Sequence, residues 1–288
     1  MDAAHNTAHN AGFEFIKKLG EELSHQSFDL PPFPENMMRV REALNDPDIS
    51  INSVAQVIHS DPLLTIRLLR MANSAMLRRG PVEIIDLKMA ISRLGMEMVR
   101  NTSISMAMDQ TFKVPKDSPV YDTIEETRIH CSHVGALSYL LTKRYQPRLS
   151  TDEAMLAGLV HDIGKFYILT RIGDYPEIVA DPVAIDGILL DWHPGVGRMI
   201  IETWGFSDAI AEAADEHECL DREHFGGADI TDIVIVANQL SHLDSDDSEG
   251  QQALVQLPSF SKTGISPDDL VVILEESEEE IASMATAL

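Results

Sequence analysis

The sequence predicts an all-α protein, built as a helical bundle of two lobes. Apolar residues recur at the three- and four-residue intervals of amphipathic helices, as in Phe13, Ile16 and Leu19. N-cap residues and prolines that can start a helix precede many of these stretches, and no stretch shows the alternation typical of a strand. Hydrophobic residues make up 44% of the 288 positions, enough for a sizeable core, which excludes global disorder.

Local start and stop signals predict the helices of the N-terminal part. Asp61-Pro62 places an N-cap side chain before a proline at the first helical position. Gly80-Pro81 breaks the chain, and Gly95 can end a helix. In order, we expect helices over residues 13–23, from Pro34 through Met37, Val40 and Leu44, over 54–59 with Ser53 as N-cap, over 63–77, over 86–93, and through Val99, Ile104 and Met108.

Two capping boxes predict the next pair of helices. Thr123 with Glu126 opens a helix over 124–145, and Ser150 with Glu153 opens one over 151–170. The remaining expected helices run from Pro194 to Trp204-Gly205, from Ser207 to near His217, from 232 to 243 after Thr231, and from Ser266-Pro267 to about Met284.

These signals predict three parts. Residues 1–29 form an N-terminal helix, residues 30–243 the main domain, and residues 244–288 an acidic linker with a C-terminal helix. A polar turn over 115–119 divides the main domain into an N-terminal helical lobe, 30–114, and a second lobe, 115–243.

Charge and cysteine content limit the partners and the compartment. The net charge is −25, so phosphate backbones and anionic lipids are repelled, which disfavours nucleic acid and membrane surfaces as partners. Cys131 and Cys219 show no metal or disulfide spacing and are expected as reduced thiols in a cytoplasmic protein. The N-terminus lacks the pattern of a signal peptide, and no apolar run approaches the roughly 18 residues of a membrane span.

The adjacent pair His161-Asp162, near the end of an apolar stretch, is the first candidate site. If the helices over 124–145 and 151–170 pack antiparallel, His130 faces His161 across their seam. Ala157 and Gly158 are small enough to let the two helices approach closely. Two imidazoles and a carboxylate suit a divalent metal, with iron, manganese, zinc and nickel as candidates.

Further polar residues lie downstream. His193 precedes Pro194 at an expected helix N-terminus, where backbone N–H groups favour an anion such as phosphate. Glu216 and His217 end a helix, and both residue types bind metals, although they also suit an exposed helix end. Asn238 lies on an apolar helix face, and its neutral amide is a poorer metal ligand than a carboxylate. We interpret His59, His133 and His224 as structural histidines.

The chain resembles the HD superfamily, and within it the HDOD branch, the HD-related output domains of bacterial signalling proteins. The resemblance extends from about Leu30 to Leu243 and is carried by several motifs. These are LPPFP at 30–34, HSDPLLTIRLLRMANS at 59–74, AISRLG at 90–95, LAGLVHDIG at 156–164, and HPGVG at 193–197 followed by Trp204.

The resemblance also implies site residues. His130, His161 and Asp162 match the first three metal ligands of the catalytic HD phosphohydrolases, but the distal aspartate position falls on Asn238. His193 and His217 match additional histidines of the related cyclic-di-GMP phosphodiesterases, and Glu216 stands where those enzymes have another. Their Gly-Tyr-Pro motif is missing after His217, which argues against cleavage of cyclic dinucleotides.

Two functions follow from the resemblance. The favoured one is a signalling output module without turnover, which binds a protein partner through the N-terminal lobe or a small phosphate-containing ligand in the cleft. The alternative is a metal-dependent phosphohydrolase, in which the metal activates water, Asp162 and Lys165 are the candidate catalytic residues, and Lys165 and His193 hold the phosphate.

Overall fold

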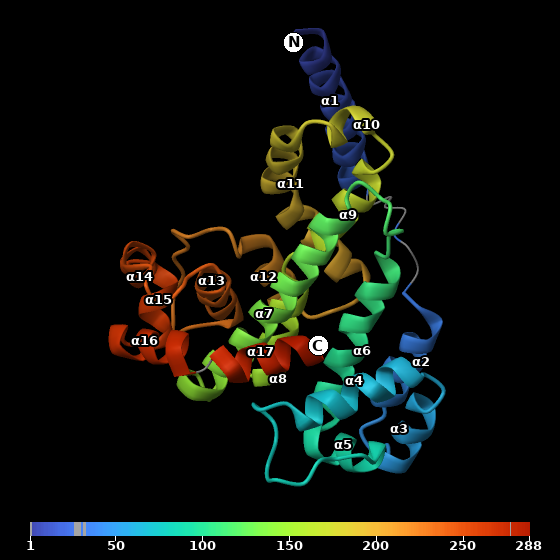
Figure 1. The fold of residues 1–288 in the computed structure, drawn as a ribbon, viewed down its shortest axis with the longest axis vertical. Coiled ribbons are helices and arrows are strands. Elements are labelled where there is room, and N and C mark those ends of the chain that lie inside the picture. Colours follow the sequence, from blue (N-terminus) through green and yellow to red (C-terminus); the bar gives the residue numbers. More distant parts are fainter. Residues whose placement is uncertain (1, 26–29, 31–32, 277) are drawn as a thin grey trace.

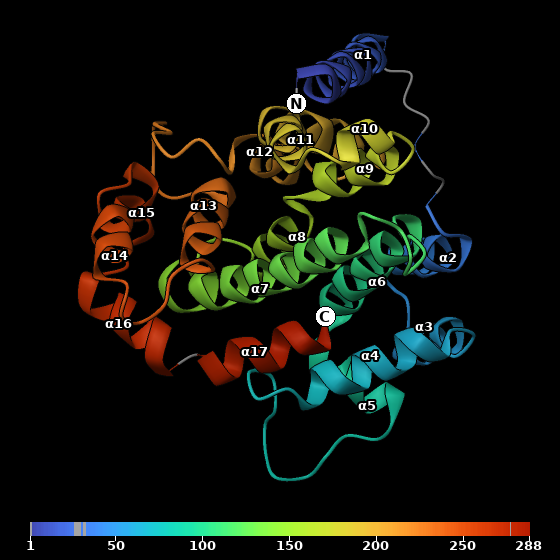
Figure 2. The same cartoon turned by 45° about the horizontal axis from the view of Figure 1, so that its top comes forward.

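The computed structural model describes residues 2–25, 30, 33–276 and 278–288, and these contain helices and no strand, which confirms the all-α prediction. Figures 1 and 2 show the long helix α7 near the middle of the molecule, and it packs against α8, α13 and α17. The helices are α1 Asp2–His25, α2 Glu35–Leu44, α3 Ile51–Ile58, α4 Pro62–Asn73, α5 Leu87–Leu94, α6 Met96–Thr111, α7 Tyr121–Tyr145, α8 Thr151–Val160, α9 Ile163–Ile172, α10 Pro176–Val179, α11 Pro182–Thr203, α12 Asp208–Glu216, α13 Ile230–Leu240, α14 Ser248–Val255, α15 Pro258–Thr263, α16 Pro267–Glu276 and α17 Glu278–Ala287.

The described residues form two large apolar cores and one small cluster of Ala72, Ile84 and Ala90. The smaller core lies among α2 to α6 and includes Val54, Leu64 and Leu68, all fully buried. The larger core fills the rest of the molecule around α7 to α13. Helix α6 contributes Val99 to the smaller core and Ile104 to the larger one, so it is the wall that the lobes share.

The helix starts in the N-terminal lobe partly match the predictions. Asp61 caps α4 by accepting hydrogen bonds from the backbone N–H groups of Leu63 and Leu64. Gly95 ends α5 with a φ of 83°, as expected. The prediction for Ser53 was wrong, because Ser50 is the N-cap of α3 and its hydroxyl accepts from the Ser53 N–H. The predicted opening motif at 30–34 falls partly on residues 31–32, which lie outside the described residues.

Two of the predicted N-cap residues in the second lobe were wrong. Ser150 caps α8 as predicted, but Thr123 does not cap α7, which already begins at Tyr121. Thr231 does not open α13 either. Asp229 does, in a capping box with Asp232, because a carboxylate two positions earlier already satisfies the first N–H groups.

Helices α7 and α8 pack closely enough to bring their histidines together. A Cβ atom on Gly158 would lie only 2.9 Å from the Gly135 Cα and 2.7 Å from the Ser138 Oγ. The two helices therefore approach each other as closely as expected, and each has a glycine at the contact. The predicted single helix over 151–170 is broken, however: α8 ends at Val160, and His161 and Asp162 occupy the turn before α9.

Other departures concern elements that sequence patterns missed. Pro194 lies inside α11 rather than at its start, so His193 is in mid-helix, while the expected end at Trp204 is confirmed. Helix α14 begins at Ser248, inside the expected acidic linker over 244–250. The expected last helix corresponds to two helices, α16 and α17, and residue 277 between their bounds lies outside the described residues. Among the described residues, no helix combines the length and apolar character needed to cross a membrane.

The two ends of the chain lie on different faces. Helix α1 lies beside α10 and α11 (Figures 1 and 2), where Phe15 meets Tyr175 edge-on at 5.3 Å. Helix α17 lies along α7 and reaches α4, with Arg70 donating to the Thr286 carbonyl. The site described next lies between α7, α8, α11, α12 and α13, in the larger lobe.

Candidate metal centre

Four histidines from separate elements converge on one aspartate. His130 comes from α7, His193 from α11, and His217 from the end of α12, while His161 and Asp162 form the turn between α8 and α9. His161, Asp162, His193 and His217 are fully buried, whereas the His130 side chain keeps 18% of its exposure. A polar cluster so deeply buried requires compensation of its charges and lone pairs.

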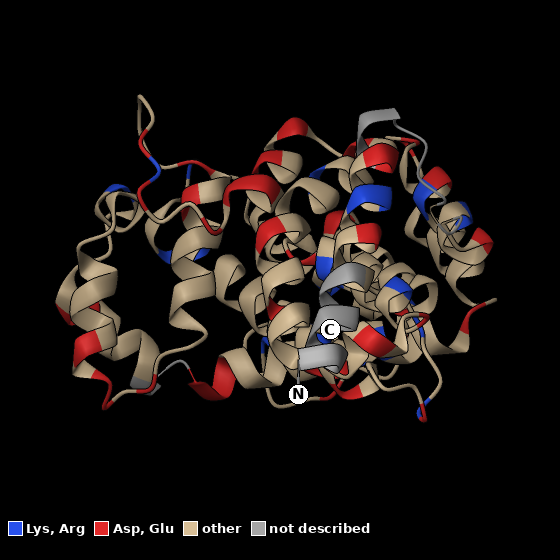
Figure 3. Cartoon of the chain, turned by 90° about the horizontal axis from the view of Figure 1, so that it is seen from above, with Lys and Arg blue, Asp and Glu red and all other residues tan. Residues whose placement is uncertain are grey.

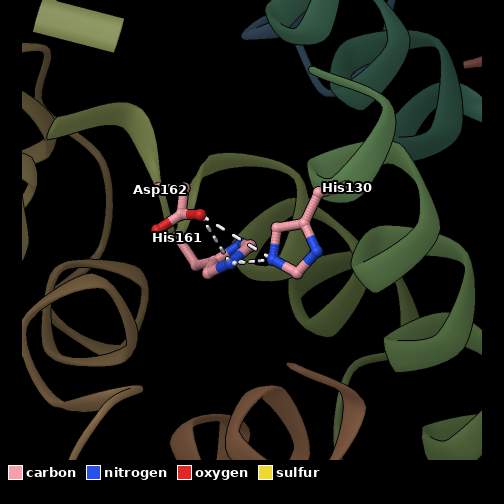
Figure 4. Close-up of side chains that lie close together, drawn as sticks. All are labelled: His130, His161 and Asp162. Atoms are coloured by element: carbon pink, nitrogen blue, oxygen red, sulfur yellow. Dashed lines mark hydrogen bonds and ion pairs between the residues drawn. The ribbon is translucent and has the colours of Figure 1, made fainter. Parts of the chain in front are cut away.

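Asp162 divides the imidazoles into two pairs. Its Oδ2 lies 3.4 Å from the His161 Nε2 and 3.7 Å from the His130 Nε2, and these two nitrogens are 3.2 Å apart (Figure 4). Its Oδ1 lies 3.3 Å from the Nε2 atoms of both His193 and His217, which are 3.0 Å from each other. One carboxylate therefore serves two histidine pairs, an arrangement suited to two neighbouring cations.

The hydrogen bonds of the other ring nitrogens define which nitrogen faces the centre. The Nδ1 atoms of His161, His193 and His217 each lie 2.6–2.9 Å from a backbone carbonyl, of Gly158, Leu189 and Ala214. Because a carbonyl oxygen only accepts, each Nδ1 must donate, and Nε2 is left to bind a cation.

A hydroxyl group, rather than a backbone carbonyl, orients the ring of His130. Ser241 donates its hydroxyl proton to the Asn238 carbonyl, so its oxygen is free to accept from the His130 Nδ1 at 3.3 Å. All four Nε2 atoms thus face the two oxygens of Asp162. The Asp162 Oδ1 is buried and accepts no well-aligned hydrogen bond.

Burial governs the protonation states. It lowers the pKa of His130 and of His193 to about 4 and that of His161 well below its ordinary value, although Asp162 opposes this. The surrounding imidazoles and Lys165 outweigh burial at Asp162 and hold the pKa of its carboxyl well below the usual range. Neutral imidazoles around an ionised carboxylate are the form in which both residue types bind metals.

Lys165 is the one ammonium at this centre among the described residues. Its Nζ donates to the Asp162 Oδ2 at 2.8 Å, and its side chain is 23% exposed. The carboxylate of Asp162, together with Glu218, outweighs burial and raises the pKa of Lys165. A partly exposed ammonium beside the buried centre is well placed to meet an incoming anion.

The structure gives different outcomes for Asn238, Glu216 and His193, the other predicted site residues. Asn238 lies beside His130, and its Oδ1 is buried without a hydrogen-bond partner. Glu216 is turned away from the histidines, because its carboxylate accepts from the Arg222 Nε at 2.6 Å. His193 lies in mid-helix, so the predicted anion site at a helix N-terminus is wrong.

Two neighbours of the centre were missed by sequence reasoning. Glu218 places its Oε1 3.6 Å from the His217 Nε2 and 4.0 Å from the His193 Nε2. His242 stacks on His130 with ring centroids 5.0 Å apart. The only sequence signal for either was its closeness in sequence to a candidate ligand.

A second charged cluster adjoins the centre but is organised around a cation of its own. His224, Asp229 and Asp232 could together hold a metal ion, yet Arg222 donates to both aspartates. The His224 Nε2 also lies 2.8 Å from the Asp232 Oδ2. We interpret this group as a structural ion-pair cluster that ties the segment after α12 to α13.

Replacing Arg222 with glutamine should lower the free energy of unfolding by about 2 kcal/mol, because the buried Asp232 and three further acids lose a shared guanidinium. Urea unfolding followed by circular dichroism measures this. Arg198→Gln is the control, since its pairs with Glu202 and Asp215 are half-exposed and should contribute less than about 1 kcal/mol. Equal losses in the two variants would contradict the structural role of the Arg222 cluster.

Comparison with known proteins identifies the family. The model of the HDOD domain matches residues 30–220, about two thirds of the chain. The chain belongs to the HDOD family. Within the HDOD match, the motif at 156–164 forms the α8–α9 turn with the histidine–aspartate pair, and the motif at 59–74 forms α4 with its Asp61 cap.

Solved structures share this HDOD fold over most of their length. A candidate metal-dependent phosphohydrolase from Shewanella amazonensis SB2B is 24% identical, with a TM-score of 0.81 over 96% of this chain and 99% of the other. An HDOD domain protein of unknown function from Geobacter sulfurreducens is 21% identical, with a TM-score of 0.66 over 93% and 96%. At these identities the likeness shows the fold alone.

Two further relatives are longer than the matched part. A candidate signal transduction protein from Marinobacter aquaeolei VT8 is 19% identical, with a TM-score of 0.59 over 99% of this chain and 66% of the other. An uncharacterized protein from Treponema pallidum (strain Nichols) is 20% identical over 215 residues, which are 70% of this chain and 40% of that protein. The chain thus matches less than half of this curated relative.

Proposed function

We propose that this HDOD protein is a signalling output module whose buried histidine–aspartate centre holds divalent metal, with iron, manganese, zinc and nickel as candidates, and binds a small phosphate-containing ligand. The observation that carries the proposal is the convergence of four Nε2 atoms on the two oxygens of Asp162. Three of these nitrogens are oriented by backbone carbonyls.

The donor set fits metal ions on structural grounds. Lone pairs that face one another at 3.0–3.2 Å repel unless a cation or proton lies among them. The orphaned Oδ1 atoms of Asp162 and Asn238 likewise lack a partner that a cation would supply. His130, His161 and Asp162 would hold one ion, and His193, His217 and Asp162 another. Such ions would act as Lewis acids toward a phosphoryl oxygen.

The partly exposed side chains beside the centre favour a small ligand. Most of the centre is fully buried, and solvent reaches it past partly exposed side chains, those of His130, Lys165 and Glu218. The Lys165 ammonium would attract a phosphate group there.

The surface of the N-terminal lobe supports a protein partner. It exposes large aliphatic side chains that a soluble protein usually buries against something else. They are Leu63 (66% exposed), Ile66 (53%), Val82 (80%), Ile85 (84%) and Met89 (59%). Acidic residues lie on many of the described helices (Figure 3), which supports a protein rather than a nucleic acid as the partner.

One observation favours a second candidate, a metal-dependent phosphohydrolase. Both histidine pairs and Lys165 surround the same carboxylate, so groups that could hold phosphate and metal lie together. In that case Lys165 would hold and neutralise the phosphate, and Asp162 would keep the two metal positions next to each other.

We expect the purified chain to retain divalent metal at one or two equivalents, measured by inductively coupled plasma mass spectrometry. The retained metal should raise the melting temperature relative to chelator-treated protein, since a ligand of the folded state alone stabilises it. Addition of inorganic phosphate to the metal-loaded chain should raise the melting temperature further. The proposal would be overturned if the purified chain contained no metal and its melting temperature did not change on adding manganese or iron.

The same preparation separates the two candidates. Steady hydrolysis of bis(p-nitrophenyl) phosphate or p-nitrophenyl phosphate by the manganese- or iron-loaded chain, lost in Asp162→Asn, would favour the phosphohydrolase. Metal binding without hydrolysis would favour the output module.

A further inference from the structure

We infer that Glu218 is the acidic ligand of the second metal position, the one at His193 and His217. This inference rests on the proposed metal-holding function. The Glu218 Oε1 lies 3.6 Å from the His217 Nε2 and 4.0 Å from the His193 Nε2, so a carboxylate oxygen faces the same two nitrogens as the Asp162 Oδ1.

Charge balance requires an acid at this position. Two neutral imidazoles and a share of one carboxylate offset little of the charge of a divalent ion in a buried site. Asp162 must serve both histidine pairs and also pairs with Lys165 through its Oδ2. A second carboxylate at the His193–His217 pair supplies the missing negative charge.

The chain turn after α12 determines which acid takes this place. Helix α12 ends at Glu216, and the turn is closed by hydrogen bonds from the Cys219 N–H to the Glu216 carbonyl and from the Arg222 N–H to the Cys219 carbonyl. Glu216 is then held by the Arg222 guanidinium, whereas Glu218, two residues later, contacts the imidazoles. The sequence pointed to Glu216 as a candidate ligand, but the acid that faces the histidine pair is Glu218.

An independent observation points to a cation at the same place. The Asp162 Oδ1 is fully buried, is directed at the His193–His217 pair, and accepts no well-aligned hydrogen bond. Glu218 is one-third exposed, so it lies between the buried histidine pair and solvent. A metal ion entering past Glu218 would meet both carboxylates and both imidazoles.

The test compares Glu218→Gln with Glu216→Gln, which makes the same change two residues away. Metal-free protein is titrated with Mn²⁺ by calorimetry, and spin coupling between neighbouring ions is followed by electron paramagnetic resonance. We expect the wild type to bind two ions with a coupled spectrum. Glu218→Gln should bind the second ion at least ~10-fold more weakly and lose the coupling. Glu216→Gln should keep both ions and show a lower melting temperature.

Other outcomes decide against the inference in distinguishable ways. Two coupled ions of unchanged affinity in Glu218→Gln, or loss of an ion in Glu216→Gln, would overturn it. A single ion in the wild type would also overturn it but leave the metal-holding function standing. A wild type that binds no Mn²⁺ would overturn both.

Discussion

Replacing Asp162 with asparagine should remove metal from both histidine pairs and lower the affinity for divalent ions by more than ~100-fold. The amide keeps the shape of the carboxylate but carries no charge, and one oxygen can no longer face each pair. Lys165 would also lose the anion that its Nζ contacts at 2.8 Å. Metal content and the rise in melting temperature on adding Mn²⁺ are the two measurements.

Asp152→Asn is the matched control for this variant. Asp152 lies in the first turn of α8, at the other end of the helix from the histidine–aspartate turn. It should therefore bind metal as the wild type does. If Asp162→Asn, folded by circular dichroism, retains wild-type metal content, the bridging role of Asp162 is wrong.

Replacing Gly164 with alanine should cost about 3 kcal/mol or more of the free energy of unfolding. A Cβ atom there would lie 2.0 Å from the His193 carbonyl oxygen and 2.8 Å from the Gly197 backbone N. Because both obstacles are backbone atoms, α9 and α11 must move apart, and interiors packed at this density resist such shifts. Since α11 carries His193, the same movement should weaken metal binding at the His193–His217 pair.

Gly187→Ala on α11 tests whether the effect comes from close packing. Apart from its chain neighbours and the backbone of its own helix, no atom lies within 4 Å of a Cβ built on Gly187. Alanine favours a helix over glycine by about 0.5–1 kcal/mol. This variant should therefore unfold at slightly higher urea concentration than the wild type. Similar destabilisation by both substitutions would contradict the argument from helix approach.

Local patterns were sufficient for the fold class and for part of the centre. Helical periodicity and caps such as Asp61 depend on residues only a few positions apart, so the sequence alone predicts them. The expected meeting of His130 and His161 depended on one antiparallel pair of neighbouring helices with small residues at the seam. The prediction for Pro194 was wrong because proline is favoured in the first turn of a helix, whereas α11 runs through Pro194 and packs against α9 and α12.

The sequence by itself determined an all-helical chain of the HDOD family with a histidine–aspartate pair at a helix end. Only the tertiary structure decided that Asp162 is shared between two histidine pairs, and that Glu218 rather than Glu216 faces one of them. The reason is that the distances among these side chains depend on how α11, α12 and α13 pack and on which carboxylates the Arg222 guanidinium binds. Such contacts join residues far apart in the chain, and no local spacing encodes them.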